Sequence, residues 1–199
     1  MPGTHALNMV ADAQSGNRLG RNDWIEAALA MLGEQGIDGV RVERLAQALK
    51  VTKGSFYWHF KDRDDLYTAM LETWRNQSVA RAMDYVAAAE DPHQRLAEIL
   101  AIPFGADISG AAADLWLSMR LWARNDARPR AAIREVDQVR SRLISRLLEA
   151  CGIPEHEARA RSVLLYSYVI AAAMLVDPAD AALRAQCEAL LTSAYSPPQ

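Results

Sequence analysis

The chain has 199 residues, of which 51% are hydrophobic and 24% charged, and its formal net charge is −3. This length and apolar content are enough to bury a sizeable core in one or two globular domains. The longest apolar run, 169–176, is far shorter than the roughly 20 residues that a membrane-spanning helix needs. The first twenty residues lack the apolar core expected of a signal peptide, and Cys151 and Cys187 lack a metal-binding spacing. We expect a cytoplasmic protein with no membrane segment, no metal and no cofactor.

Residues 1–20 have no hydrophobic period and are predicted to form a flexible arm. The first predicted helix starts at Asn22 or Asp23, either of which can cap its N-terminus, and ends at Gly36. Its apolar stripe consists of Ile25, Ala28, Leu29 and Leu32. We expect this helix to support the segment that follows it.

Two short helices joined by a tight turn are predicted in the next stretch. Val42, Leu45, Ala46 and Leu49 have the spacing of one buried helix face. Lys50 and Val51 then interrupt the pattern, and Thr52 is a suitable N-cap for a second helix, because its hydroxyl can accept a hydrogen bond from a free backbone N–H. In that helix only Phe56 and Phe60 are spaced to point inward together. Such a pair is a helix-turn-helix, whose second helix can lie in the DNA major groove.

The predicted core of these first three helices contains Ile25, Leu29, Leu32, Val42, Leu45, Leu49, Phe56 and Phe60. The outward side of the second helix is aromatic, polar and basic instead. Residues 41–63 contain six Lys or Arg residues and two acidic ones, a local charge of +4 in a chain of net charge −3. Gly54 in the first turn would let a phosphate approach the backbone closely. Positive charge is therefore concentrated where a polyanion would bind, although an ordinary solvated helix pair is the alternative interpretation.

This stretch resembles the DNA-binding signature of the TetR family of bacterial transcriptional repressors, which ends in Gly-x-x-Tyr-x-His-Phe followed by a basic and then a leucine position. The residues that carry the resemblance are Leu45, Ala46, Val51, Thr52, Lys53, Gly54, Ser55, Phe56, Tyr57, Trp58, His59, Phe60, Lys61, Arg63 and Leu66. The resemblance covers about residues 24–70. Lys50 stands where the family usually has Gly, and Val40 where Thr or Ser often caps the first helix of the motif.

A helix-turn-helix domain over residues 21–66 follows from this resemblance and from the spacing. The residues predicted to contact DNA are Arg41, Thr52, Lys53, Gly54, Ser55, Tyr57, Trp58, His59, Lys61 and Arg63. Among them Lys53 would approach the bases, Gly54 and Ser55 would allow close approach, and most of the others would hold phosphates. A homodimer would place two such helices in successive major grooves of a palindromic double-stranded operator.

The rest of the chain is predicted to be all α, as a regulatory and dimerisation domain over residues 67–195 with a loose tail at 196–199. Asp62 can cap a long helix that meets no Gly or Pro until Pro92, where Asp91 and Pro92 start the next. Further helices are predicted near 111–125, 130–150, 155–176 and 181–191. Because the long helix is shared by both domains, its tilt would couple ligand binding to the helix-turn-helix.

The helices at 130–150 and 155–176 are predicted to form a four-helix interface with a second copy. The first has an apolar spacing that approaches a heptad, and the second is apolar on nearly every side. The predicted interface residues are Ile133, Val136, Arg140, Leu143, Leu147, Leu165, Val169 and Ala172. Family members dimerise through their last two long helices, and the resemblance therefore supports a homodimer.

A pocket for a small apolar or aromatic effector is predicted from large adaptable side chains in the second half. They are Met70, Trp74, Phe104, Trp116, Met119, Arg120, Trp122, Tyr166 and Met174. Arg120 and Tyr166 would orient the ligand, and the alternative is that all of these residues are simply core. The four histidines show no catalytic or metal-ligand spacing, so we do not predict an enzyme. An all-helical dimer that binds a ligand or a protein without touching DNA is the alternative function.

Overall fold

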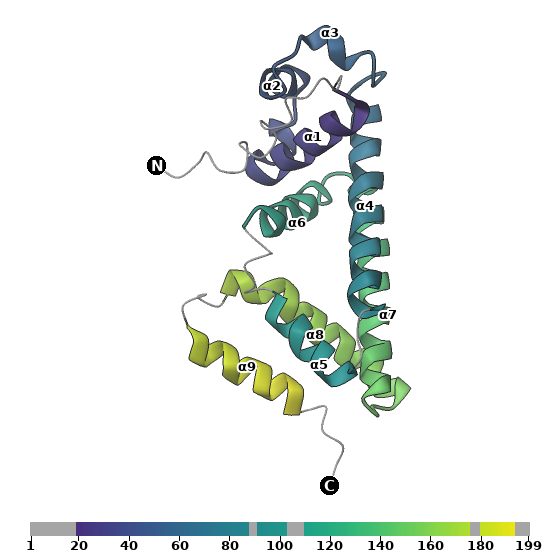
Figure 1. Ribbon diagram of the computed structural model, residues 1–199, viewed down its shortest axis with the longest axis vertical. Helices are drawn as coiled ribbons and strands as arrows, with labels where there is room; N and C mark the ends of the chain where they lie inside the picture. Colours follow the sequence, from purple (N-terminus) through teal and green to yellow (C-terminus); the bar gives the residue numbers. More distant parts are fainter. Residues whose placement is uncertain (1–18, 88–90, 103–109, 176–179, 194–199) are drawn as a thin grey trace. The chain divides into compact units, whose positions relative to one another are not determined.

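The computed structural model describes residues 19–87, 91–102, 110–175 and 180–193 (Figure 1). Every regular element within these ranges is helical, which confirms the all-α prediction. The predicted tail, nearly all of the predicted arm and Phe104 lie outside the described residues.

The helices closely follow the predicted pattern. In the first part of the chain they are α1 (Arg21–Gln35), the 3-10 helix η2 (Ile37–Gly39), α2 (Val42–Ala48), α3 (Lys53–Phe56) and α4 (Arg63–Ala87). They are followed by α5 (Pro92–Ala101), α6 (Gly110–Trp122), α7 (Ala127–Ala150), α8 (Glu155–Leu175) and α9 (Ala181–Ser193). The chain forms two compact units, of which the first comprises Met1–Arg75 and Gly110–Ile133 and the second comprises Asn76–Ser109 and Arg134–Gln199.

Local hydrogen bonds define several of the helix ends. Gly36 has a φ of 69° and its N–H donates to the Leu32 carbonyl at 2.9 Å, so the predicted end of α1 is confirmed. Asp62 accepts from the Asp65 N–H at 2.9 Å, as predicted for the start of α4. The predicted start of α1 is wrong, because the helix begins at Arg21 and Asp23 reaches back to accept from the Gly20 N–H at 2.6 Å.

The turn between α2 and α3 requires an uncommon backbone conformation. Lys50 has a φ of 57°, and it is the non-glycine residue with a positive φ in the part of the chain that the structure describes. The next N–H, that of Val51, donates to the Ala46 carbonyl at 2.9 Å and closes the turn. A left-handed conformation places a side chain close to its own carbonyl group, which explains why glycine suits this position.

The second helix of the pair is shorter than predicted. Regular α-helix spans only Lys53–Phe56. Thr52 is its N-cap residue, as predicted, but the Thr52 hydroxyl does not make the expected capping hydrogen bond. Beyond Phe56 the chain continues in tight turns, in which the His59 N–H donates to the Phe56 carbonyl at 2.9 Å. Residues 57–59 are two aromatics and a histidine with modest helix propensity, and tighter i→i−3 bonding is common at helix ends.

The core of the first unit is built on aromatic packing. Seven of the eight predicted core residues are buried, whereas Leu49 is half-buried. Trp24, which we did not predict, is fully buried and its ring meets that of Phe56 edge-on at 5.4 Å. Phe56 also stacks on Phe60 at 5.2 Å. These three rings fix the short helix α3 onto α1.

Helix α6 packs against α1 in the same unit. The Ser118 hydroxyl donates to the Gly33 carbonyl at 3.4 Å, and Trp122 meets Tyr67 of α4 edge-on at 5.1 Å. The second unit has its own core, in which α5, α7 and α8 supply Leu96, Ile99, Leu100, Ile144, Leu147, Leu148, Ala158, Leu165 and Tyr166. Cys151 is part of this core, as expected for a small buried apolar residue.

The left-handed turn gives a first prediction. We expect Lys50→Gly to unfold at a higher temperature than Lys50→Ala, because both variants remove the charge but only glycine adopts a positive φ without strain. The difference in the free energy of unfolding should be about 1 kcal/mol, which corresponds to roughly 2–4 °C for a chain of this size. Thermal unfolding followed by circular dichroism measures it, and equal midpoints would show that the turn is unstrained.

Candidate nucleic-acid interface

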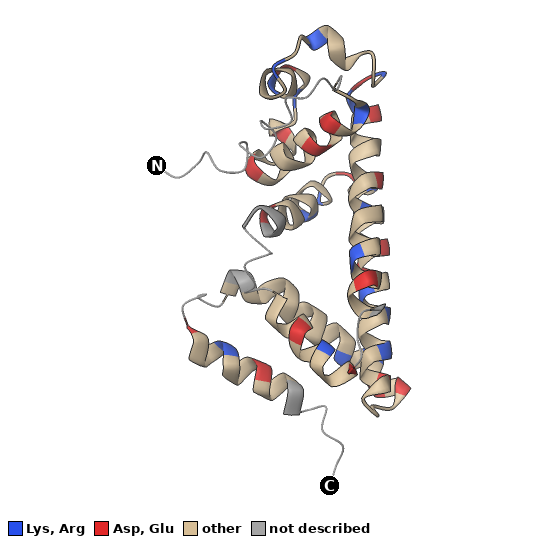
Figure 2. Ribbon diagram, viewed as in Figure 1, with Lys and Arg blue, Asp and Glu red and all other residues tan. Residues whose placement is uncertain are grey.

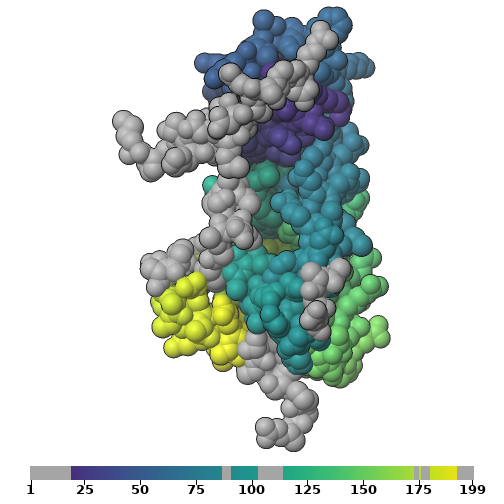
Figure 3. Space-filling model, in the orientation of Figure 1, coloured from purple at the N-terminus to yellow at the C-terminus, as the bar shows by residue number. Residues whose placement is uncertain are grey.

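The buried rings of Phe56 and Phe60 determine which side chains of this segment face outward. Because these two residues point into the core, Tyr57 and Trp58 between them are directed to the surface, where 57% and 88% of their area is exposed. The segment stands at the surface of the molecule in the space-filling view, in blue (Figure 3). An almost fully exposed tryptophan contributes little to folding, and large exposed apolar groups commonly mark interaction sites.

Several Lys and Arg residues lie in the segment from α2 to the start of α4 (Figure 2), and some cationic side chains near it are held by neighbours. The Arg41 Nε donates to the Asp38 carbonyl at 3.0 Å, which places its guanidinium group beside the start of α2. Arg63 lies over the Tyr67 ring at 5.3 Å. Arg21 lies over the Phe60 ring at 4.6 Å and pairs with Asp65 at 3.3 Å. Neighbouring residues therefore restrain these three guanidinium groups near the segment.

Lys53, the predicted base-reading residue, forms an ion pair with Glu43 of α2. Both side chains are more than half exposed. The hydrogen bond to Lys53 lowers the pKa of Glu43, and the same bond raises the pKa of Lys53, so both groups stay charged near neutral pH. Glu43 was not predicted to be a site residue, because its pairing with Lys53 joins residues on two different helices.

All ten predicted DNA-contact residues lie in one segment, which runs from the N-cap of α2 to the first residue of α4. Exposed members are Arg41, Thr52, Lys53, Gly54, Tyr57, Trp58, Lys61 and Arg63, and the half-buried members are Ser55 and His59. Together they present ammonium, guanidinium, hydroxyl and aromatic groups beside one another. Such groups bind phosphate oxygens and the faces and edges of nucleic-acid bases.

The predicted effector residues are not all brought together. Met70 and Trp74 of α4 and Met119 and Trp122 of α6 are buried in the first unit, where they form part of its core. Trp116 is half-buried, and the Arg120 guanidinium lies over its ring at 4.0 Å. Tyr166 belongs to the second unit, in which its hydroxyl donates to Asp137 at 2.9 Å. Phe104 and the Met174 side chain lie outside what the structure describes.

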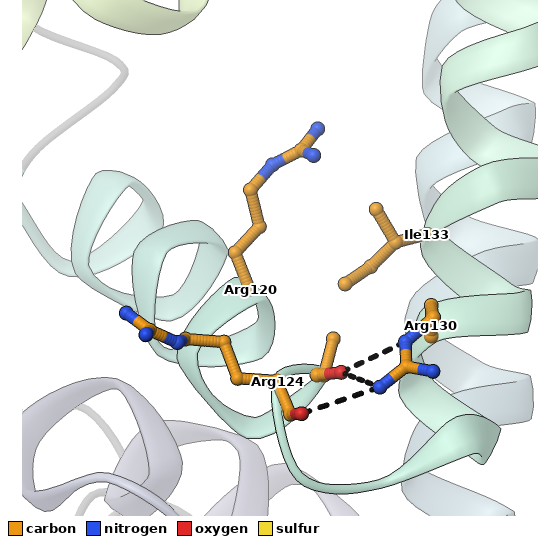
Figure 4. Close-up of a pocket in the computed structure, with 5 residues that line it drawn as sticks. Arg120, Arg124, Arg130 and Ile133 are labelled. Carbon is orange, nitrogen blue, oxygen red and sulfur yellow. Dashed lines mark hydrogen bonds between the residues drawn. The ribbon is translucent and has the colours of Figure 1, made fainter.

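A shallow depression of about 290 Å³ lies at the junction of α6 and α7 (Figure 4). Among the predicted effector residues, Arg120 lines it, together with Ala123, Arg124, Arg130 and Ile133. The Arg120 and Ile133 side chains face the same space, whereas the Arg124 side chain points away. Arg130 donates to the carbonyls of Ala123 at 2.9 Å and Arg124 at 3.2 Å and so caps the end of α6.

The residues predicted to form the dimer interface are buried or half-buried within their own chain, whereas an interface needs exposed side chains. Arg140, Leu143 and Val169 are half-buried, and the other five are covered by their own chain, namely Ile133, Val136, Leu147, Leu165 and Ala172. Residues already buried in one protomer offer little area to a second copy. Exposed apolar side chains lie instead on α8 and α9, at Val163, Leu164, Leu183 and Leu190.

Two further findings concern metals and membranes. Within the described residues, His, Cys, Asp and Glu nowhere gather in a group of three that could hold a metal ion. None of the described helices combines the length and the apolar character needed to cross a lipid bilayer.

Comparison with known proteins identifies the segment. The model of the tetR family of bacterial regulatory proteins matches residues 25–70. The chain is 33% identical over 81 residues to the HTH-type transcriptional regulator AcrR of Shigella flexneri, a match that covers 40% of this chain and 38% of AcrR. It is 40% identical over 68 residues to the class D tetracycline repressor protein of Escherichia coli, covering 34% of this chain and 29% of the repressor. The chain thus spans well under half of the curated relatives it matches.

The solved structure of the multidrug binding protein EbrR, complexed with malachite green, extends the likeness to the whole fold. It shares 25% sequence identity, a TM-score of 0.63, and 89% coverage of this chain and 98% of EbrR. The names of these proteins are those of regulators, repressors and a drug-binding protein, and none is that of an enzyme. Residues 25–70 are therefore similar to the tetR family of bacterial regulatory proteins.

Proposed function

We propose that this chain is a TetR-like transcriptional repressor that binds a palindromic operator as a homodimer and releases it when a small ligand binds. The observation that carries the proposal is the exposed pair Tyr57 and Trp58, which stands between the buried residues Phe56 and Phe60 in a stretch rich in Lys and Arg. A surface of aromatic and basic groups on a helix-turn-helix suits the DNA major groove and its phosphates. The relatives named as repressors support this function.

Two copies are needed for tight binding to a palindrome, because each helix-turn-helix reads one half-site. The exposed apolar residues of α8 and α9 support an interface there, with Leu164 and Leu190 exposed by 65% and 73%. Both helices belong to the second unit, where α5 packs against each of them. We therefore propose that the dimer contact is made by the exposed apolar residues of α8 and α9.

The proposed effector is a small apolar or aromatic molecule. Half-buried Trp116, with Arg120 over its ring, offers an aromatic face and a cation at the edge of α6. EbrR, which has the same fold, is complexed with malachite green, an observation that supports an aromatic ligand for this chain as well. Because α6 packs against α1, ligand binding beside α6 would act directly on the helix that supports α3.

Truncation of the most exposed aromatic residue tests the DNA-binding proposal. We expect Trp58→Ala to bind a duplex from the region upstream of its own gene roughly tenfold more weakly or worse, because a large contact residue is lost. Its thermal midpoint should not change, since 88% of the side chain is exposed. A gel mobility-shift titration with excess non-specific competitor measures the affinity.

Met83→Ala is the matched control, because Met83 is another large apolar side chain, 55% exposed, outside the helix-turn-helix. It should bind the duplex like the wild type. If Trp58→Ala also bound like the wild type, the assigned contact would be wrong. If the wild type formed no salt-sensitive, sequence-specific complex, the alternative of a ligand- or protein-binding dimer without DNA binding would be favoured.

The proposed interface is tested by placing a charge in it. Leu164→Glu should weaken self-association by roughly tenfold or more, because a carboxylate would be buried without a partner. Sedimentation equilibrium measures this, and binding to a two-half-site duplex should weaken in parallel. Leu121→Glu, at a residue of α6 that is 53% exposed, is the control and should remain dimeric. A wild-type monomer, or a fully dimeric Leu164→Glu variant, would contradict the proposed interface.

A further inference from the structure

The ion pair between Glu43 and Lys53 stands out on the surface that faces DNA in the proposed function. It links α2 to the first residue of α3, within the basic and aromatic segment described above. Both side chains are more than half exposed. The Lys and Arg residues that we predicted to contact DNA are cations, whereas Glu43 and Asp62 are the acidic residues of the stretch 41–63. Glu43 is the one that pairs with the predicted base-reading residue, Lys53.

Neither folding nor general DNA affinity accounts for this carboxylate. Exposed ion pairs contribute little to stability, because water screens them and both side chains lose freedom. Near a duplex, a carboxylate is repelled by the phosphates, and by neutralising Lys53 it also removes a cation from their attraction. A carboxylate that lowers general affinity on a DNA-binding surface is explained if it contributes to the choice of sequence.

The bases offer a partner for both members of the pair. In the major groove guanine presents two neighbouring acceptors, O6 and N7, and the paired cytosine presents the N4 donor beside them. An ammonium group suits two adjacent acceptors, and a carboxylate suits the single donor. An A·T pair separates its acceptors by the adenine N6 donor and carries the thymine methyl group, so it matches a lysine with a neighbouring glutamate less well.

We infer that Glu43 and Lys53 act together to read one G·C base pair in each half-site, with the Lys53 Nζ donating to guanine O6 and N7 and the Glu43 carboxylate accepting from cytosine N4. This inference rests on the proposed function and specifies which residues select the operator sequence. Glu43 is thus a specificity-determining residue, and its pair with Lys53 keeps both groups positioned before DNA binds.

Selection from a random duplex library, followed by affinity measurements on the selected duplexes, tests the inference with the full-length chain. The wild type should enrich a G·C pair at one position, repeated symmetrically in both half-sites. Glu43→Ala and Lys53→Ala should each lose the preference at that same position, by roughly 5- to 150-fold relative to the wild type. The double variant should lose little more than either single variant, since the two residues act on one base pair.

Glu43→Ala should also bind non-specific duplex more tightly and with a steeper salt dependence, because Lys53 is then free to contact phosphate. Glu155→Gln removes an exposed carboxylate at the start of α8 and should change neither the selected sequence nor the salt dependence. Circular dichroism should show unchanged folding for the Glu43 variant, as expected for an exposed pair.

The inference is overturned if Glu43→Ala selects the same sequences as the wild type and only binds all of them more tightly, since Glu43 would then merely restrain Lys53. It is also overturned if the two single variants change different positions, or if the position is A·T. If the wild type selects no duplex at all, the proposed function itself fails. Failure of the inference can be distinguished from failure of the proposed function, because each of the three outcomes that overturn the inference still requires a sequence-specific complex of the wild type.

Discussion

The contact between Phe56 and Trp24 is the constraint on which the rest of the helix-turn-helix depends. Helix α3 has only one turn of regular hydrogen bonding, far too short to be stable by itself. It keeps its position because Phe56 is fully buried between the rings of Trp24 and Phe60. The same burial directs Tyr57 and Trp58 to the surface. The packing of Phe56 in the core thus fixes the backbone that carries the exposed side chains of Tyr57 and Trp58.

Tyr67 connects this anchored segment to α6 within the first unit. Its ring meets Trp122 at the end of α6, and its hydroxyl donates to the Val40 carbonyl, two residues before α2, at 3.5 Å. Burial raises the pKa of Tyr67, as expected for a phenol in a packed interior. A displacement of α6 would therefore reach the start of the helix-turn-helix through a single side chain. The tilt of the long helix α4, which the sequence suggested as the switch, is then not the sole route by which a ligand could act.

Features set by residues close together in the chain could be predicted from the sequence. The inward pair Phe56 and Phe60 followed from spacing, and the caps at Gly36 and Asp62 followed from side-chain and backbone chemistry within one turn. Thr52 shows the limit of such reasoning, because it occupies the cap position with the right backbone but makes no side-chain bond there. Competing hydrogen-bond partners and rotamers are set by three-dimensional surroundings that a local pattern does not contain.

Contacts between distant segments could not be predicted in the same way. The packing of α6 on α1 joins Ser118 to Gly33 across 85 positions, and no periodic pattern specifies which face of one helix meets the other. An apolar stripe predicts that a face is buried, but not what covers it. For that reason the apolar positions of α7 were assigned to a second copy, whereas Val136 and Leu147 are covered by their own chain.

The charge distribution of the surface fits a protein that must choose among sequences as well as bind DNA. Cations alone bind every duplex, because phosphate attraction carries no sequence information. A protein whose contact surface were uniformly basic would be held mainly on non-specific sites, which greatly outnumber operators. An acidic residue paired with one of the cations weakens that general attraction and leaves a directional donor and acceptor in place. In the proposed function, the cations of residues 41–63 would supply affinity for DNA, and the pair of Glu43 and Lys53 would supply selectivity.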